Sequence, residues 1–351
     1  MIMGLSLATS RFDGSVPMSL LHTPVCELLG CDEPVVLSGL GGVARAELVA
    51  AVSEAGGFGF LGMVREPPAL IEAEIARVRA ATGRPFGVNL IPAATAPALL
   101  EAELATVLAA EIAAVMLFWD LRADVLRRLR DARLIVVCQV GSALEARQAV
   151  DAGAQVVVAQ GVEAGGHVRG RTPLLELLPA VLEAVTVPVL AAGGIVDGAQ
   201  LAQLMTMGAQ GAVLGTAFMA TRESYAHDYH KARLLAARAG DTVHTEAFHI
   251  NWPRGAPVRV LANSVTRGER GDPFNSAPTV IGDEDGRPIH LFSTDSPLRN
   301  MRGDFEAMAL YAGQGVGALV DLPPAAERLQ RIVDTARDIL AHHNTTELPC
   351  N

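Results

Sequence analysis

A strand-and-helix unit that recurs eight times restricts this chain to very few folds. Each unit has a short apolar run, then a glycine-containing loop, then an amphipathic stretch rich in Ala, Leu and Glu. The runs start about 20 to 32 residues apart, which suits parallel strands joined by helical crossovers. They are apolar throughout, as strands covered on both faces are. The predicted strands are 34–38, 58–62, 86–91, 113–118, 134–139, 155–160, 187–192 and 211–215.

Eight consecutive units of this kind predict an α/β fold, a (β/α)8 TIM barrel with an additional C-terminal lid lobe. An open doubly wound sheet has the same local pattern and is the alternative. The number of units, and the lack of a GxGxxG sequence after the first run, favour the closed barrel.

Residues at the predicted helix ends support the same division. Ser142 and Glu145 predict a capping box, and Asp197 predicts a second helix start. The pair Thr172-Pro173 predicts an N-cap followed by a proline in the first helical position. Pro179 falls inside that helix, so we expect a kink or a later start.

Composition and periodicity along the chain suggest four segments. Residues 1–22 read as a disordered leader, 23–225 as the barrel, 226–320 as a loop-rich substrate or lid region, and 321–351 as a C-terminal helix and tail. Residues 241–300 are rich in Gly, Pro, Asn, Asp and Arg without a clear period, whereas 222–240, 304–312 and 324–342 look helical. A loop-rich stretch of this length is usually functional, so we expect it to cover the barrel mouth.

Composition excludes several classes of protein. Half of the residues are hydrophobic and 19% are charged, which excludes a disordered chain. A net charge of −10 without a basic block argues against binding to nucleic acid or to an anionic membrane. No apolar run reaches the roughly 18 residues of a membrane span. The four scattered cysteines argue against a disulfide framework or zinc site and favour a cytoplasmic protein; they are Cys26, Cys31, Cys138 and Cys350.

Two glycine pairs follow the last two predicted strands, where TIM barrels often bind phosphate. Gly193 and Gly194 end one strand, and Gly215 with Thr216 end the next. Glycine lets the backbone approach a ligand closely, bare N–H groups attract an anion, and Thr216 adds a hydroxyl donor. The alternative is that these glycines only form tight turns. Because both pairs lie where a phosphate is expected, we favour a phosphate site.

The stretch QGVEAGGH at 160–167 is the most distinctive in the chain. It places His167 a few residues beyond the sixth strand, on a glycine-rich loop at the barrel mouth. A neutral imidazole there could take a proton from carbon or stabilise an anionic substrate. The alternative is a surface or structural histidine, but the position and the surrounding glycines favour a catalytic one.

These segments together resemble the nitronate monooxygenase family, formerly called 2-nitropropane dioxygenases. The resemblance rests on QGVEAGGH, AAGGI at 191–195, GAQGAVLGTAF at 208–218, Asn89 in FGVNL and AGQGVG at 312–317. It covers residues 23–225 well and the lid less completely. It implies a barrel that binds FMN non-covalently and oxidises alkyl nitronates with O2, with His167 as the base for neutral nitroalkanes.

The resemblance also implies which residues contact the flavin. Asn89 and Gln139 would approach the ring from the third and fifth strands, and a protein's main influence on such a cofactor is through donors near the ring. For Ser38, Asn89 and Gln139 the alternative is a polar residue that only caps a strand end. The full implied set is Ser38, Gly39, Leu40, Asn89, Gln139, Gly165, Gly166, Gly193, Gly194, Gly215, Thr216 and, in the late loop, Gln314.

The chain departs from the family pattern at three places on the substrate side. Leu37-Ser38 stands where the family commonly has Pro-Met, Val168 separates His167 from the following Arg-Gly, and the segment 249–260 is longer than usual. Phe118 and Trp119, after the fourth strand, could form a pocket wall or belong to the core. The remaining histidines lack partners at ligand spacing, so we expect no metal site.

Two other functions remain open on the sequence alone. An FMN-dependent NAD(P)H reductase, resembling enoyl-acyl-carrier-protein or NADH:quinone reductases, would share the glycine sites and the loop histidine. The other is a non-catalytic barrel that binds a phosphorylated ligand and acts as a sensor or scaffold. For the leading reading the expected partners are a small-molecule substrate and O2, and a homodimer is one expected assembly.

Overall fold

The predicted barrel is present. The computed structural model describes residues 21–346, so the predicted leader lies almost wholly outside the described residues, as does Cys350. Eight parallel strands form a closed barrel in the order β1-β2-β3-β4-β5-β6-β8-β9, which confirms the closed barrel over the open sheet. The barrel strands are β1 (Val35–Leu37), β2 (Phe58–Gly62), β3 (Gly87–Leu90), β4 (Ala114–Leu117), β5 (Ile135–Val140), β6 (Val156–Gln160), β8 (Val189–Ala192) and β9 (Ala212–Leu214).

The barrel closes where its first and last strands pair. Leu37 of β1 is in register with Leu214 of β9 on one side and with Gly59 of β2 on the other. Inside the barrel, apolar side chains such as Phe58, Phe60 and Met116 form one buried cluster. A second, larger cluster fills the space between the strands and the surrounding helices. The closed interior therefore leaves ligands only the ends of the strands.

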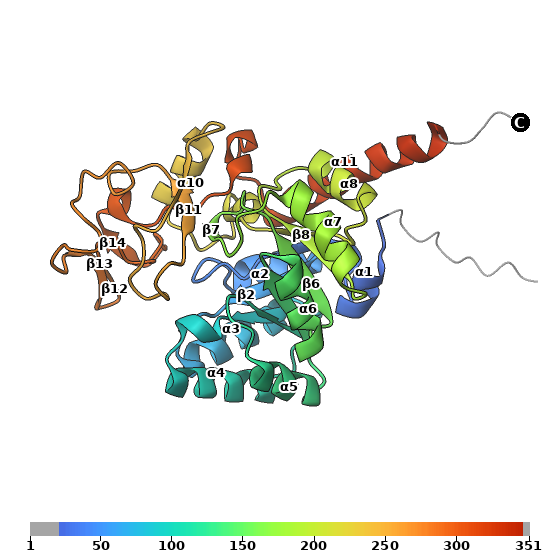
Figure 1. Cartoon of the computed structure of the whole chain (residues 1–351), viewed down its shortest axis with the longest axis horizontal. Coiled ribbons are helices and arrows are strands. Elements are labelled where there is room, and N and C mark those ends of the chain that lie inside the picture. The colour runs from blue at the N-terminus through green and yellow to red at the C-terminus, as the bar shows by residue number, and fades with distance from the viewer. Residues whose placement is uncertain (1–20, 347–351) are drawn as a thin grey trace, which may run out of the picture.

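Helices surround the barrel (Figure 1). The long α11 packs along α8 and also contacts α2. Among residues 21–346, no helix is both long and apolar enough to cross a membrane. The helices and 3-10 turn of this part are α1 (Pro24–Leu29), α2 (Ala46–Glu54), α3 (Pro68–Ala81), η1 (Pro92–Ala94), α4 (Pro97–Ala109), α5 (Ala123–Asp131), α6 (Ala143–Ala152), α7 (Leu174–Ala184), α8 (Gly198–Thr206), α9 (Thr216–Met219) and α11 (Ala325–Thr346).

The predicted helix ends are partly confirmed. Asp197 forms a complete capping box with Gln200 at the start of α8. Ser142 accepts a hydrogen bond from the Glu145 N–H, but the Glu145 carboxylate accepts from Gly141 rather than from the cap residue. The Thr172 N-cap was wrong, because α7 is preceded by Pro173 and its helix continues through Pro179.

The lid region is more regular than its composition suggests. After α10 (Asp228–Ala236), β10 (Thr242–Thr245) and β11 (Val258–Leu261) form a sheet with β7 (Gly166–His167). A second sheet contains β12 (Val280–Glu284), β13 (Arg287–His290) and β14 (Met301–Gly303). The orange strands of Figure 1 lie to one side of the barrel, beyond β7.

The expected helix at 304–312 was wrong. Only the turns η2 (Phe305–Ala307) and, further on, η3 (Gln314–Ala318) are helical here. Between them the chain is extended and bonds to β11, with a bridge from Val260 to Tyr311 and a hydrogen bond from the Leu261 N–H to the Leu310 carbonyl. Pairing with a strand distant in sequence replaces the local bonds of a helix.

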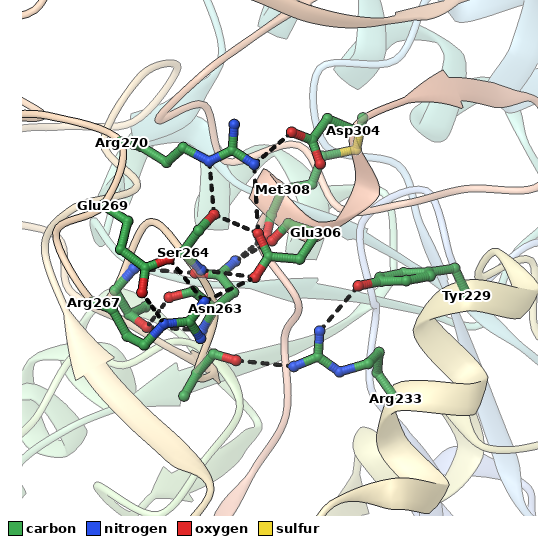
Figure 2. Close-up of polar contacts among 12 residues, drawn as sticks. Tyr229, Arg233, Asn263, Ser264, Arg267, Glu269, Arg270, Asp304, Glu306 and Met308 are labelled. Carbon is green, nitrogen blue, oxygen red and sulfur yellow. Dashed lines mark hydrogen bonds and ion pairs between the residues drawn. The ribbon is translucent and has the colours of Figure 1, made fainter.

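A polar cluster holds the lid together (Figure 2). Asn263 donates from its side-chain amide to the carbonyls of Glu306, at 2.8 Å, and Met308, at 2.9 Å. Glu306 accepts from the Ser264 hydroxyl, and Arg270 donates to the same hydroxyl oxygen at 2.8 Å. The turn after β11 is thereby tied to the segment that carries Tyr311 to the barrel mouth.

Candidate active site at the barrel mouth

A cavity of about 410 Å³ lies between the carboxyl ends of the barrel strands and the lid. All the residues that the sequence assigned to the site, apart from Gln314, line this cavity. They are Ser38, Gly39, Leu40, Asn89, Gln139, Gly165, Gly166, His167, Gly193, Gly194, Gly215 and Thr216. The side chain of Gln314 is exposed and is not part of the wall.

One end of the cavity is built from backbone. Gly193 and Gly194 have φ angles of +121° and +71°, a left-handed path that favours glycine. Within the described chain, the backbone N–H groups of Gly194, Gly215 and Thr216 donate no hydrogen bond. The Thr216 hydroxyl accepts from the Gly313 N–H at 2.9 Å, so its own proton is available for another acceptor. This end can therefore bind an anion such as a phosphate.

The AGQG segment at 312–315 packs against the loops that carry Gly165 and Gly194 at this end of the cavity. The Gln314 N–H donates to the Glu163 carbonyl at 2.9 Å, so Gln314 acts here through its backbone. A Cβ on Gly315 would lie 2.2 Å from the Gly194 carbonyl oxygen, and one on Gly165 would lie 2.5 Å from the Gly313 nitrogen. The backbones touch directly, which leaves no room for side chains at these positions.

Amide side chains line the middle of the cavity. Asn89 is buried and donates to the Met116 carbonyl at 3.1 Å, which leaves its amide oxygen as an acceptor. The Gln139 side chain makes no hydrogen bond with the described residues. A Cβ on Gly39 would lie 2.1 Å from the Asn89 Cβ, so this close approach requires glycine. Asn89 and Gln139 therefore have polar atoms free to hydrogen-bond a ligand in the cavity.

The segment that carries His167 is held from two sides. Gln160 donates to the His167 carbonyl at 2.9 Å and accepts from the Arg169 N–H at 3.2 Å. On the lid side, β11 pairs with β7, with Val258 opposite His167. Arg259 of β11 donates twice to the Val162 carbonyl, at 3.1 and 2.8 Å. The histidine predicted on a loop therefore lies in a short strand that the lid completes.

Aromatic rings surround the His167 imidazole. Trp252 stacks on it, with ring centroids 3.3 Å apart and an angle of 12° between the planes. Trp119 and Tyr311 lie at 6.0 and 6.1 Å between centroids. The Nε2 atom of His167 is buried and has no hydrogen-bond partner among the described residues.

This environment keeps His167 neutral. Burial, and secondarily the nearby Arg65 guanidinium, lower its pKa well below the usual 6.5. A neutral imidazole with an unpartnered nitrogen can accept a proton from a bound substrate. The same burial raises the pKa of the Tyr311 phenol, whose hydroxyl donates to the Thr294 carbonyl at 2.8 Å.

The lid and the β2 loop add residues that the sequence did not predict. Arg65, Trp252, Thr294, Asp295 and Tyr311 all line the cavity. The long segment 249–260 hinted at Trp252, since it departs from the family pattern on the substrate side. The others follow no motif, because tertiary folding alone brings them to the barrel mouth.

The aromatic pair after β4 serves both of its predicted roles. Phe118 lines the cavity, whereas Trp119, with a φ of +84°, packs against Phe118 and Trp252. Among residues 21–346, no three His, Cys, Asp or Glu side chains gather in a way that could hold a metal. His230 is instead buried against Ser296 and the Tyr311 carbonyl.

Known proteins share this architecture along most of the chain. The family model of nitronate monooxygenase matches residues 22–118 and 100–335. A nitronate monooxygenase of Paraburkholderia phytofirmans is 32% identical, over 87% of this chain and 92% of the relative. A (3aS,4S,5R,7aS)-5-hydroxy-7a-methyl-1-oxo-octahydro-1H-indene-4-carboxyl-CoA dehydrogenase of Mycobacterium tuberculosis is 34% identical, over 93% of this chain and 98% of the relative.

Solved structures give the same picture. FabK from Thermotoga maritima superposes with a TM-score of 0.77 and is 26% identical, covering 93% of this chain and 99% of that protein. A nitroalkane oxidase from Streptomyces ansochromogenes superposes with a TM-score of 0.74 and is 31% identical, covering 91% of this chain and 99% of that protein. The similarity thus includes both the barrel and the lid.

Proposed function

The chain belongs to the nitronate monooxygenase family, and from this premise we propose that it is an FMN-dependent oxidoreductase that oxidises alkyl nitronates and nitroalkanes with O2. One observation carries the proposal. A neutral His167 with an unpartnered Nε2 lies on the wall of the cavity. At the other end of the same cavity lie the free backbone N–H groups of Gly194, Gly215 and Thr216, which we call the glycine cradle. Such a cavity suits a phosphate-bearing cofactor at one end and proton transfer at the other.

The cavity residues fit FMN. The left-handed Gly193 and Gly194, with Gly215 and Thr216, would hold the phosphate, because their N–H groups and hydroxyl proton are free. Asn89 and Gln139, with Ser38, Gly39, Leu40, Gly165 and Gly166, would hold the ring. FMN, when bound, supplies the electron acceptor that the amino acids lack.

The protein's own contribution is proton transfer and exclusion of water. For a neutral nitroalkane, His167 Nε2 would accept the proton from the carbon that bears the nitro group. A nitronate has already lost that proton and does not need the base. The aromatic rings around His167 keep water away from the reacting carbon.

A second candidate is the oxidation of a coenzyme A thioester. It is favoured by the 34% identity to the mycobacterial carboxyl-CoA dehydrogenase. That similarity extends over nearly the whole length of both chains. A thioester also has an acidic proton on the carbon next to its carbonyl, so His167 could serve the same role. The two candidates share the cavity and the base and differ in the substrate that the lid admits.

Anaerobic mixing distinguishes these functions. The purified protein, loaded with FMN, is mixed without oxygen with ethylnitronate, with nitroethane, with an acyl-CoA thioester, or with NADH or NADPH. The proposal predicts rapid bleaching of the flavin absorbance by ethylnitronate and its return on admission of O2. Bleaching by the thioester alone would support the second candidate, and rapid bleaching by NADH or NADPH alone would support the reductase alternative.

The His167→Asn variant tests the base. Loss of a positioned base typically costs a factor of about 10² to 10⁴, so we expect nitroethane turnover to fall by at least about 100-fold. Turnover of ethylnitronate should change by only a few fold, because no proton is removed. Equal losses on both substrates would argue that His167 has another role.

A further inference from the structure

Arg65 lies at the cavity in a backbone conformation that arginine rarely adopts. It follows β2, lines the cavity, and has a φ of +58°. This left-handed region is unfavourable for a residue with a Cβ, and glycine would occupy it without strain. Strained residues cluster at functional sites, so the backbone conformation of Arg65 favours a role for its side chain in this cavity.

The Arg65 guanidinium has no anionic partner. It donates to the Asn251 carbonyl, a neutral acceptor, and forms no ion pair within residues 21–346. The neighbouring Glu66 is paired with Arg45 at 2.8 Å. Burial raises the pKa of Glu103, which lies near the Arg65 and Glu66 backbone, to about 8, so that this carboxyl is mainly neutral at pH 7.

The other cation on the cavity wall is already neutralised. Arg287 is paired with Glu284 at 2.5 Å and with Asp295 at 2.9 Å. Arg65 therefore stands alone among the described cavity-lining residues as a cation without a countercharge.

Arg65 acts electrostatically on the reactive end of the cavity. Its charge contributes to the low pKa of His167 and opposes the rise in the pKa of Tyr311. The geometry agrees, because Arg65 donates to the carbonyl of Asn251, and the next residue, Trp252, stacks on the His167 ring. The Tyr311 ring lies 6.1 Å from the same imidazole, so the guanidinium, the imidazole and the phenol lie at one end of the cavity. Protonation of His167 beside this cation is unfavourable unless an anion lies near both.

We propose that Arg65 binds the anionic group of the substrate beside His167, and that this group is a planar, delocalised anion such as a nitronate or a carboxylate. The inference deepens the proposed function and rests on it for the identity of the reaction. A guanidinium presents a flat fork of N–H donors that matches two oxygens sharing one charge. Nothing else on the described cavity wall offers an unpaired cation for that purpose.

This assignment accounts for the proton balance with a neutral nitroalkane. The C–H bond next to the nitro group breaks, its proton goes to His167 Nε2, and its electron pair becomes the delocalised charge on the two nitro oxygens. Arg65 then binds those oxygens while the imidazolium lies beside the same anion. A preformed nitronate has no proton to transfer, so it binds to Arg65 while His167 stays neutral.

Binding of a simple anion tests the proposal without turnover. Nitrate and propionate serve as probes, and the ring signals of His167 are followed by NMR in protein labelled at histidine, with His167→Asn used for assignment. In the unaltered protein, each anion should shift the His167 signals in a saturable manner. In Arg65→Met, the dissociation constant should rise at least about tenfold, the effect of losing one charge-assisted contact.

The matched control removes an arginine in the same conformation elsewhere. Arg133, with a φ of +63°, is exposed between α5 and β5 and does not line the cavity. The Arg133→Gly variant should bind the anions with the dissociation constant of the unaltered protein. The Arg65→Gly variant relieves the same kind of backbone strain but should bind the anions more weakly, because it lacks the guanidinium. Unchanged anion binding in both Arg65 variants would overturn the proposal.

Kinetics and flavin content separate this inference from the proposed function. With FMN bound, Arg65→Met should raise the KM for ethylnitronate at least about tenfold and leave the FMN content unchanged. Loss of FMN with intact anion binding would assign Arg65 to the cofactor and overturn the inference. If ethylnitronate fails to bleach the flavin while nitrate still binds through Arg65, the proposed reaction fails and the anion site stands.

Discussion

His167 owes its chemical character to the lid that covers it. Trp252 lies flat against the imidazole at 3.3 Å, and burial rather than any hydrogen bond sets its protonation state. A histidine whose folded-state pKa is lowered stays neutral below pH 6.5 and can act as a base there. The sequence predicted the residue but not this environment, because Trp252 lies 85 positions later in the chain.

The pH dependence of nitroalkane oxidation follows from this burial. The value of kcat/KM for nitroethane should remain constant as the pH falls through 6.5, because His167 in the free enzyme is not yet protonated there. Steady-state rates measured between pH 5 and 8, corrected for ionisation of the substrate, check this. An acidic limb centred at 6.5 or higher would show that the imidazole is solvated.

Removing the stacked ring should restore an ordinary histidine. In Trp252→Ala, water reaches the imidazole, so the pKa of His167 should rise toward 6.5 and an acidic limb should appear in the rate profile. NMR titration of the ring gives the pKa directly. Trp252→Phe, which keeps an aromatic face, is the control and should behave largely as the unaltered protein; a similar shift in both variants would contradict the desolvation argument.

At the scale of elements, the site depends on close backbone contacts between η3 and the glycine loop after β8. A side chain at Gly315 would collide with the Gly194 carbonyl at 2.2 Å, so Gly315→Ala must displace one segment. We expect a loss of about 1–3 kcal/mol in the free energy of unfolding and a weaker affinity for FMN. Denaturant unfolding and flavin titration measure the two effects.

A matched glycine provides the control for that experiment. Gly83, between α3 and β3, has an ordinary φ and no atom within 4 Å of a Cβ placed on it. Gly83→Ala should leave FMN affinity unchanged and stability within about 0.5 kcal/mol of the unaltered protein. Equal effects of the two substitutions would mean that the η3 contact is not specific.

Helix α4 carries a buried carboxyl whose ionisation opposes folding. Glu103 is fully buried, and its pKa rises from 4.5 to about 8, mainly through burial. Because the folded-state pKa is the higher one, the contribution of Glu103 to the free energy of unfolding is most favourable below pH 4.5. This contribution is lost as the pH rises toward 8. Glu103→Gln should therefore gain stability relative to the unaltered protein across that interval, by about 2–4 kcal/mol at pH 8.

Denaturant unfolding of both proteins at pH 5 and at pH 8 measures this difference. The gap between the two free energies of unfolding should widen with pH. A gap that is independent of pH would show that Glu103 is ionised in the folded protein or finds a partner.

The elements also show what sequence patterns can and cannot reveal. Each barrel strand could be predicted because a continuous apolar run and its following helix are local signals. The lid strands could not, because β10 and β11 are set by pairing with each other and with the two-residue β7, far away in the chain. The extended segment before Tyr311 was mistaken for a helix for the same reason.

For the whole molecule, the barrel supplies the glycine end of the cavity, and the lid supplies Trp252, Asp295 and Tyr311 to its wall. The glycine cradle and His167 could be predicted because TIM barrels place their sites at strand ends. Arg65 lies in the loop after β2, and Tyr311 and Asp295 come from the lid. No sequence motif links the three residues, so only the folded chain shows that they line one cavity. The lid is where we expect substrate preference to be set.

Cofactor binding should stabilise the molecule as a unit, because both halves contact the cavity. At a free FMN concentration about 100 times the dissociation constant, the free energy of unfolding should rise by about 2.7 kcal/mol. Thermal unfolding with and without FMN measures the shift. Riboflavin, which lacks the phosphate, should give a clearly smaller shift, and equal shifts would argue against the glycine cradle as a phosphate site.

The central claim is that one cavity holds the FMN phosphate at the strand-end glycines and the flavin ring beside His167. A crystal structure of the complex with FMN tests it most directly. We expect density for the phosphate against Gly193, Gly194, Gly215 and Thr216, and for the ring along Asn89 and Gln139 with its reactive face toward the imidazole. A cavity without FMN at saturating cofactor, or a ring remote from His167, would contradict it.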